Sequence, residues 1–295
     1  MSEKFSLTDR FEAERPGLRA VAYRMLGSLT EAEDAVQDTW LKLNRTDVSE
    51  VKNLGAWLTT VVGRVCLDML RSRTSRREEP LPEQEGPVRL PDPVVTPLGR
   101  IDPEQEVLVA DAVGIALMVV LEALSPAERL AFVLHDMFDV PFDDIATTLG
   151  RTTVSTRQLA SRARRRVQGA APAADTDLAR KRDVVDAFLA ASRGGDFEAL
   201  LAVLDPHVVA RSDGGTLVPS ILRRGATAVA SQAITFARFA ADTRLVLVNG
   251  TPGVVSFSRG RRPLSVMSFT IQCGRITGLD ILSDPGRLTT LGLTT

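Results

Sequence analysis

The sequence predicts a multidomain protein in which two all-α domains are followed by an α+β domain. Apolar residues recur with helical spacing over residues 11–73 and again over residues 111–168. Between these stretches, residues 77–110 contain seven prolines, with eight acidic and only three basic residues. From about Arg180 onward, helical patterns give way to runs of β-forming residues separated by glycine. A chain of 295 residues has room for two or three such domains.

The changes in composition suggest where each domain begins and ends. Because proline removes a backbone donor and blocks helix formation, the proline-rich segment is predicted to be an extended, acidic linker. We assign a first helical domain to residues 1–76, the acidic linker to 77–110, a helix-turn-helix domain to 111–168, a second linker to 169–180 and the α+β domain to 181–295.

Several classes of protein do not fit the composition. No apolar run approaches the length of a membrane span, and the first residues contain no apolar signal segment, so we expect no membrane partner and a cytoplasmic location. Cys66 and Cys273 lie far apart, which fits a reducing compartment and gives no disulfide framework. His135 and His207 are too isolated for a metal cluster. We therefore predict no metal and no cofactor.

The stretch EAEDAVQDTWLKL, residues 31–43, is predicted to form an amphipathic helix. One side is apolar, whereas the opposite side is acidic and carries Leu41 within it. Thr30 and Glu33 have the spacing of a capping box, which predicts the start of this helix. An acidic face is usually a solvated face, so the helix alone does not identify a docking surface.

A first helix is predicted over residues 11–26, ending at Gly27, and after the helix at 31–43 a third helix is predicted over residues 56–73, AWLTTVVGRVCLDMLRSR. Trp57 does not lie in the middle of its apolar arc but on the polar side, together with Arg64 and Arg71. An aromatic residue beside arginines suits single-stranded nucleic acid, which is held by stacking and by phosphate neutralisation. Alternatively, Trp57 covers the edge of the core and the arginines are solvated. The helix by itself favours neither interpretation.

A helix-turn-helix is the clearest local signal. A short helix, Asp143–Leu149, ends at Gly150, and a second helix is predicted to begin near Thr153 or Val154. Six arginines without an acid lie between residues 151 and 166, which favours DNA binding over a merely solvated face. The outward face of the second helix carries Arg157, Gln158, Ser161, Arg162 and Arg165.

The last third of the chain is predicted to contain helices followed by an antiparallel sheet. Asp205, His207, Asp213 and Asp280 are its candidate acids and bases, but no spacing singles them out, and Asp205-Pro206-His207 is predicted to form a turn. We assign no catalytic residue and expect no enzyme activity. The predicted helices are residues 180–196, 197–204 and 225–240, and the predicted strands are residues 243–250, 253–260, 263–274 and 275–284.

The helix at 31–43, the third helix and the helix-turn-helix together resemble regions two and four of the extracytoplasmic-function (ECF) sigma factors. The resemblance implies an alternative sigma factor that binds core RNA polymerase, through its β′ and β subunits, and promoter DNA. It implies that Asp34, Gln37, Asp38 and Leu41 dock on the clamp helices of β′; that Lys52, Asn53, Trp57, Arg64 and Arg71 melt and read the minus-ten element; and that Arg157, Gln158, Ser161, Arg162 and Arg165 read the minus-thirty-five element.

The last third of the chain resembles a SnoaL-like domain, an α+β cone of the nuclear transport factor type, found in one group of ECF sigma factors. Three short motifs of that group are recognisable in altered form, as RLPDPVV, SDGGTL and DPGRL. The resemblance implies that this domain tunes activity in cis, through Leu90, Pro91, Asp92, Pro93, Asp213, Gly214, Gly215, Asp284, Pro285 and Arg287.

Two alternatives stay open at this point. The SnoaL-like domain could bind a small ligand, because an apolar cone is a natural pocket. The whole protein could instead be a one-component, ligand-sensing helix-turn-helix regulator, although that hypothesis leaves the first three helices unexplained.

Overall fold

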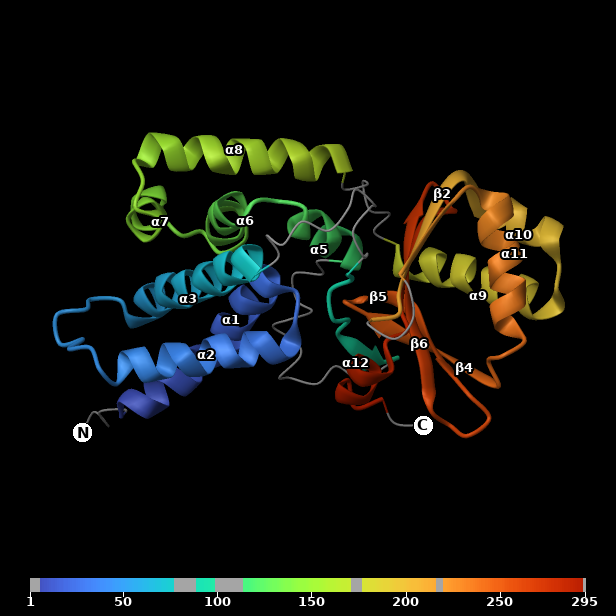
Figure 1. The fold of residues 1–295 in the computed structure, drawn as a ribbon, viewed down its shortest axis with the longest axis horizontal. Helices are drawn as coiled ribbons and strands as arrows, with labels where there is room; N and C mark the ends of the chain where they lie inside the picture. The colour runs from blue at the N-terminus through green and yellow to red at the C-terminus, as the bar shows by residue number, and fades with distance from the viewer. Residues whose placement is uncertain (1–5, 77–88, 99–113, 171–176, 216–219, 294–295) are drawn as a thin grey trace. The chain divides into compact units, whose positions relative to one another are not determined.

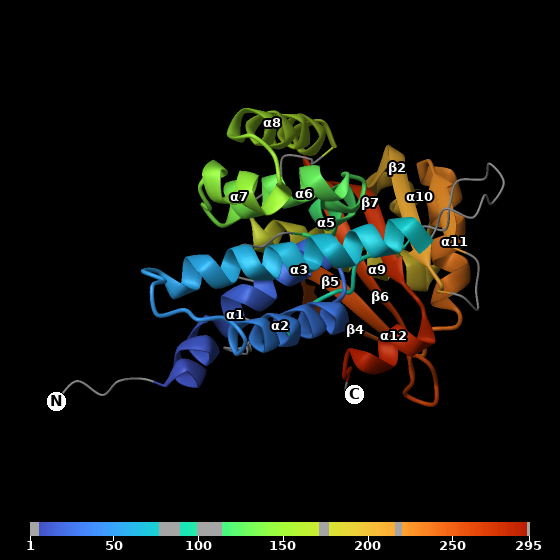
Figure 2. The ribbon, with the colours of Figure 1, turned by 60° about the vertical axis from the view of Figure 1, so that its left-hand side comes forward.

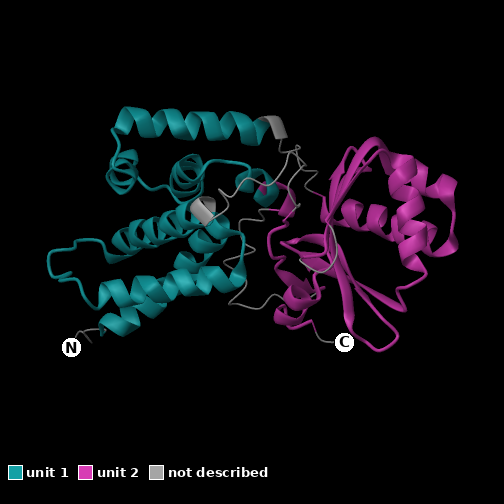
Figure 3. Ribbon diagram, in the orientation of Figure 1, with its two compact units in different colours: residues 1–82, 118–170 teal, residues 83–117, 171–295 magenta. Residues whose placement is uncertain are grey.

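The structure, a computed structural model, describes residues 6–76, 89–98, 114–170, 177–215 and 220–293. It divides into two compact units, coloured separately in Figure 3. Unit 1 comprises residues 1–82 and 118–170, and unit 2 comprises residues 83–117 and 171–295. Within the described residues, no helix is both long enough and apolar enough to cross a membrane.

Three helices that contact one another form the first part of unit 1: α1 (Leu7–Leu26), α2 (Leu29–Leu43) and α3 (Leu54–Arg76) (Figure 2). Gly27 closes α1 in a left-handed conformation, as expected for a glycine at that position. The predicted capping box at the start of α2 is wrong. Ser28 caps this helix instead, by accepting a hydrogen bond from the backbone N–H of Glu31.

The second part of unit 1 contains the helix-turn-helix. Its helices are α5 (Ile115–Glu122), within which the two units divide, α6 (Pro126–Phe132), the π-helix η1 (Val133–Met137), α7 (Phe142–Leu149) and α8 (Thr153–Ala170). Gly150 joins α7 to α8 with φ 63°, a left-handed conformation that glycine adopts without strain. The predicted start of α8 is confirmed at Thr153.

The two helical parts of unit 1 pack against each other. A Cβ atom at Gly63 of α3 would lie 3.1 Å from Leu134 Cδ1 and 3.2 Å from Leu130 Cδ1, so the absence of a side chain allows this close approach. Arg129 is 3% exposed, and its Nε donates to the carbonyl oxygen of Arg24, 3.0 Å away. Burial lowers the pKa of Arg129 to about 10. The contact is therefore an interior one, with a buried cation at its centre.

Unit 2 is built on a seven-stranded sheet whose order is β1-β4-β5-β6-β7-β2-β3. The helices α9 (Leu178–Gly194), α10 (Phe197–Val203) and α11 (Ala226–Ala237) share a hydrophobic core with one face of the sheet, and α12 (Pro285–Thr290) contacts β6 (Figure 1). The strands are β1 (Val95–Pro97), β2 (Leu204–Asp213), β3 (Ile221–Arg224), β4 (Asp242–Val248), β5 (Thr251–Phe257), β6 (Pro263–Gln272) and β7 (Arg275–Leu282).

The four predicted strands are β4 to β7, and their antiparallel pairing is confirmed. The sequence predicted neither β2 nor β3, and it did not predict the parallel pairing of β2 with β7. The turn predicted at Asp205-Pro206-His207 is wrong, because these residues lie within β2, where the register with β7 shifts. The N–H of His207 donates locally to Asp205 Oδ1, 2.8 Å away, as in the turn that Asp-Pro suggested.

Part of the predicted linker belongs to the sheet. Residues 95–97 form β1, the edge strand, which pairs antiparallel with β4. Their proline content predicted a free tether, but residues 89–98 are held against the sheet. Proline is tolerated here because an edge strand can dispense with some backbone donors. The rest of that linker falls on residues 77–88 and 99–110, outside the described part of the chain.

Candidate functional site

The outer face of α2 is exposed as predicted. Asp34, Gln37 and Asp38 are all exposed, and Leu41 beside them is 45% exposed. The other acids of this helix are used internally, since Glu31 pairs with Arg73 and Glu33 pairs with Arg19. These four residues of α2 therefore face outward, whereas Glu31 and Glu33 connect α2 to its neighbouring helices.

The polar stripe of α3 follows the helical spacing expected from the sequence. Lys52, Arg64 and Arg71 are exposed, and Trp57 is half-buried. Asn53 also has a structural role, because its Oδ1 accepts a hydrogen bond from the backbone N–H of Ala56 at the start of α3. A half-buried aromatic ring on the same stripe as cations can still stack on a base while the cations neutralise a phosphate.

All five predicted readout residues of α8 are exposed: Arg157, Gln158, Ser161, Arg162 and Arg165. Two other arginines of this helix are used internally. Arg164 pairs with Asp136, and Arg166 Nη1 lies 3.0 Å from Glu128 Oε2. These pairs fix the helix on its neighbours, although the Arg166 side chain is itself 58% exposed, and leave the other arginines of the outer face for a partner.

Val154, near the start of α8, was missed by sequence reasoning. Its side chain is 64% exposed, which is unusual for a valine of this fold. It precedes Arg157 by about one helical turn, on the end of the helix that enters the major groove in helix-turn-helix proteins. An exposed apolar side chain at that point suits contact with a thymine methyl group. The helix buries Thr156, Leu159 and Ala160, which places Val154 on its exposed side. The sequence could have indicated this only if the first residue of the helix had been known.

In unit 2, Arg287 of α12 holds the linker segment. Its Nε donates to Asp92 Oδ1 at 2.7 Å, its Nη1 donates to Asp213 Oδ2 at 2.7 Å, and its Nη2 donates to the carbonyl oxygen of Leu90 at 2.6 Å. Asp213 Oδ2 also accepts the backbone N–H of Leu90, 2.8 Å away. Since Asp92 and Asp213 are buried, these are charge-assisted bonds in a dry setting. We call Leu90, Asp92, Asp213 and Arg287 the linker clamp.

The glycine loop after β2 fits against the start of α12. A Cβ atom at Gly215 would overlap the carboxylate of Asp284, and Gly215 has φ 71°, so only glycine fits here. Asp284 caps α12 by accepting the N–H groups of Gly286 and Arg287. The structure thus brings together the three motifs of the sequence. Pro91 and Pro93 lie near Val248 and Leu282 of the sheet. Gly214 and Pro285 are chain neighbours of the residues that make the contacts described above.

Asn249 is a second anchor that the sequence did not reveal. It exchanges two hydrogen bonds with Val94: Asn249 Oδ1 accepts the N–H of Val94 at 2.9 Å, and the N–H of Asn249 donates to the carbonyl of Val94 at 2.8 Å. Asn249-Gly250 has the signature of a tight hairpin turn between β4 and β5. That signature predicts the turn but not its partner, which lies 155 residues away.

The candidate acids and bases of unit 2 do not converge. Asp213 belongs to the linker clamp, and Asp280 pairs with Arg211, 3.1 Å away. Burial raises the pKa of Asp280, against the opposing charge of Arg211. Asp205 and His207 lie at the register shift in β2. The described residues contain no group of three His, Cys, Asp or Glu side chains placed to hold a metal ion.

Comparisons with known proteins agree with this arrangement. Residues 10–76 match the family Sigma-70 region 2, and residues 115–167 match the family Sigma-70, region 4. The probable ECF RNA polymerase sigma factor SigI of Mycobacterium tuberculosis is 35% identical over 294 residues, which cover 98% of this chain and 97% of that protein. The chain belongs to the extracytoplasmic-function sigma factors.

Two further similarities concern the ECF sigma factor SigJ of the same organism. It is 38% identical over 297 residues, covering 95% of this chain and 92% of that protein. The crystal structure of SigJ covers 96% of this chain and 98% of its own, with a TM-score of 0.75 and 35% identity. The predicted fold class is confirmed: two all-α sigma domains are followed by an α+β domain.

As an ECF sigma factor, the protein is an alternative sigma factor that directs transcription initiation. Sigma factors bind core RNA polymerase and promoter DNA, and they are not themselves enzymes. The hypothesis of a one-component regulator is not favoured, since both sigma regions are present in order.

Proposed function

We propose that the C-terminal unit regulates this sigma factor in cis by holding the chain that joins its two sigma regions. The observation that carries the proposal is the linker clamp. Residues 89–98 lie between α3 and α5 in the sequence, yet Arg287, Asp213 and Asn249 fix them to unit 2. A clamp on the connection limits how far the two sigma regions can separate.

Separation is required by the geometry of a promoter. The minus-ten and minus-thirty-five elements are about 25 base pairs apart, or about 85 Å at 3.4 Å per base pair. A compact unit of the size of unit 1 has a radius of gyration of only about 14 Å. The packing of Gly63 on Leu130 and Leu134 is therefore a closed state that must open before both elements can be read.

The exposed faces of unit 1 are assigned to the partners that the family implies. We propose that Asp34, Gln37, Asp38 and Leu41 dock on the β′ subunit and that the β subunit receives the second helical part. The melted minus-ten strand would be held by Lys52, Asn53, Trp57, Arg64 and Arg71. The minus-thirty-five element would be read by Arg157, Gln158, Ser161, Arg162 and Arg165. Because core polymerase is the partner, the proposed site of action is the cytoplasm.

We propose further that the C-terminal unit has no catalytic role. Asp213 and Asp280 each have an arginine partner, and Asp205 and His207 lie apart from them. A general acid or base needs to be aimed at a substrate, and these four residues do not point to one shared site.

Reconstituted transcription with core polymerase tests the proposal. The full-length chain is compared with a chain that ends after Ala170, on a promoter that the sigma factor uses. We expect promoter-specific activity to change markedly when residues 171–295 of unit 2 are removed, whereas co-purification with core polymerase persists. Equal activity of the two chains would show that residues 171–295 are a passive fusion. Promoter binding that needs no polymerase would support a one-component regulator instead.

A further inference from the structure

Unit 2 contains a cavity of about 450 Å³ between its sheet and the helices α9 and α11. This volume lies within the range of pockets that enclose a drug-sized molecule. The pocket opens on the same face of the sheet that carries the hydrophobic core, with strand residues such as Val254, Met267 and Leu279 in its wall.

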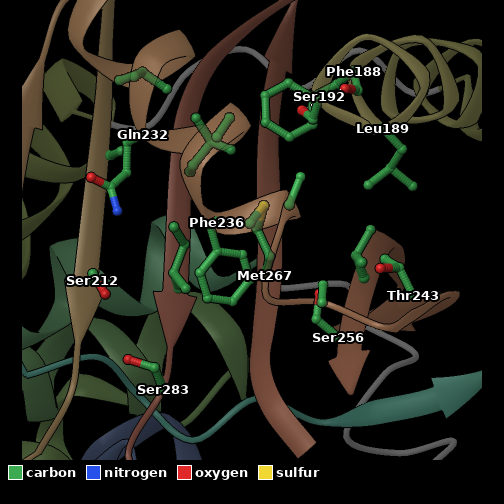
Figure 4. Close-up of a pocket in the computed structure, with 18 of the residues that line it drawn as sticks. Phe188, Leu189, Ser192, Ser212, Gln232, Phe236, Thr243, Ser256, Met267 and Ser283 are labelled. Carbon is green, nitrogen blue, oxygen red and sulfur yellow. Dashed lines mark hydrogen bonds between the residues drawn. The ribbon is translucent and has the colours of Figure 1, made fainter. Parts of the chain in front are cut away.

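The wall is mainly apolar. Figure 4 shows Phe236 and Met267 meeting in the middle of the space, with Phe188 and Leu189 of α9 on one side. Such side chains favour a ligand with a large apolar surface, which gains free energy by leaving water.

A few polar groups stand around this apolar surface. They include Ser192, Ser212, Gln232, Thr243, Ser256 and Ser283, which come from α9, β2, α11, β4, β5 and the residue after β7 (Figure 4). Among the described residues that line the pocket there is no histidine, tyrosine, cysteine or lysine. A wall with this composition can bind and orient a molecule but offers little acid–base chemistry.

The charges in the wall favour a negatively charged ligand. Asp242, the one acid among the described lining residues, lies 3.0 Å from Arg244, so its charge is compensated. Arg193 donates to the carbonyl oxygen of Thr243. Arg223 of β3 lines the pocket half-buried, and no acid of the described residues lies within ion-pair distance of it. A guanidinium in this setting matches a carboxylate, which it can bind through two parallel hydrogen bonds.

We propose that this pocket binds an apolar molecule bearing a single carboxylate, with Arg223 as the residue that recognises the charge. The apolar body lies against Phe236 and Met267, and the serine and threonine hydroxyls serve its remaining polar atoms. The site is a sensor site rather than a catalytic one, because its lining carries no general base aimed inward.

The pocket is also connected to the linker clamp. Ser212 of the wall directly precedes Asp213 of the clamp. Ser283 of the wall donates to the carbonyl oxygen of Asp213 from both its N–H, at 2.8 Å, and its Oγ, at 3.2 Å, and it directly precedes Asp284, the cap of α12. A ligand that moves Ser212 or Ser283 therefore moves residues that hold Leu90. This coupling rests on the proposed regulation in cis, whereas ligand binding does not.

A matched pair of variants tests the binding site. Arg223 and Arg224 are neighbours on β3, but Arg224 is exposed and lies on the opposite face of the strand. Binding of anthracene-9-carboxylate and of the uncharged 9-anthracenemethanol to the full chain is followed by fluorescence. We expect the carboxylate to bind more tightly and Arg223→Gln to weaken it by roughly tenfold or more, with Arg224→Gln unchanged. No binding, equal binding of the alcohol, or an unaffected Arg223→Gln would overturn the proposal.

Hydrogen exchange of the full chain tests the coupling. The amide of Leu90 bonds to Asp213, next to the pocket, whereas the amide of Val94 bonds to Asn249 at the β4–β5 turn. Saturating anthracene-9-carboxylate should change the exchange rate of Leu90 severalfold and leave Val94 unchanged. Binding without any change at Leu90 would refute the coupling while preserving the site. The effect of truncation on transcription is measured separately, so its failure would refute the cis regulation alone.

Discussion

The arginines of α8 and the arginine of the linker clamp use the same side chain in opposite settings. Arg157, Arg162 and Arg165 are exposed, and none of them forms an ion pair with a described acid. Arg287 has a side chain only 20% exposed and bonds to two carboxylates and a carbonyl of its own chain. Exposed charges of this kind are available to a partner, whereas buried ones organise the protein itself. Substitutions in the two regions should therefore differ in what they damage.

The largest effect is expected on the exposed side, at Asp38 of α2. Asp38→Arg should abolish assembly with core polymerase, because it reverses a charge at the centre of the proposed docking face. The fold should persist, since the side chain is exposed. Co-purification with core polymerase measures the loss. Asp183→Arg, the same exchange at an exposed site of α9, is the matched control. Normal assembly of the Asp38 variant would return this face to an ordinary solvated surface.

The buried side of the comparison predicts damage to stability instead. Arg287→Ala leaves Asp92 and Asp213 buried without this partner, which should destabilise unit 2 by roughly 3–5 kcal/mol. Arg182→Ala removes a solvent-exposed pair with Asp186 and should cost less than about 1 kcal/mol.

Urea unfolding of unit 2 measures both losses. Hydrogen exchange at Leu90 should become faster only in the Arg287 variant, because only there is the segment released. A stable Arg287→Ala protein with Leu90 still protected would contradict the clamp.

Exposed faces were predictable from sequence, and the clamp was not predictable from local pattern. The faces of α2 and α8 follow from helical periodicity alone, because a helix places residues three and four apart together. The clamp joins Asp92 to Arg287, 195 residues away, and no spacing rule reaches that far. Only the resemblance to a sigma-factor group brought those motifs forward.

The errors of the sequence analysis have local physical causes. At the start of α2, Ser28 and Thr30 are both good caps, and the choice between them depends on where the preceding Gly27 turns the chain. At β1, seven nearby prolines indicated an unpaired linker, but an edge strand tolerates them. The cavity beside Phe236 depends on how α9 and α11 meet the sheet, which no single element specifies.

A smaller effect is expected within α8, where neighbouring arginines contrast most directly. Arg162 is exposed, whereas Arg164 pairs with Asp136. Arg162→Ala should cost about 1–3 kcal/mol of promoter binding by the holoenzyme and relax the preference at one base pair. Arg164→Ala should leave that preference intact. Binding to promoters with single substitutions in the minus-thirty-five element measures both. An unchanged preference in the Arg162 variant would remove this residue from base readout.

The closed packing of unit 1 predicts a gain of activity. Gly63→Leu places side-chain atoms where Leu130 and Leu134 already lie, so it should weaken the closed state by about 1–3 kcal/mol. Transcription by the holoenzyme should rise, because the open state is the one that spans the promoter. Gly17→Leu is the control, since beyond its chain neighbours and its own helix backbone nothing lies within 4 Å of a Cβ there. Lower activity of the Gly63 variant, with the control unchanged, would contradict a closed inhibitory state.

The smallest effect concerns Glu128 of α6, a buried acid whose ion-pair partner Arg166 is exposed. Burial alone would raise its pKa, but hydrogen bonds from Ser125 and the charge of Arg166 outweigh burial and lower the pKa below its usual value. Its stabilising contribution is therefore present above the unfolded pKa, near 4.5, and is lost as the pH falls through the lower folded pKa.

Glu128→Gln keeps the capping-box spacing but removes the charge, so it should cost about 1 kcal/mol at neutral pH. The difference from the wild type should shrink as the pH falls below 4.5. Trp40 and Trp57, the two tryptophans of the chain, both belong to unit 1, so their fluorescence during denaturation reports on this unit alone. A difference that stays constant with pH would mean that Glu128 acts through packing rather than through its charge. Glu128 would then differ both from the exposed arginines of α8 and from the ion-paired Arg287, because its charge would play no part in its effect.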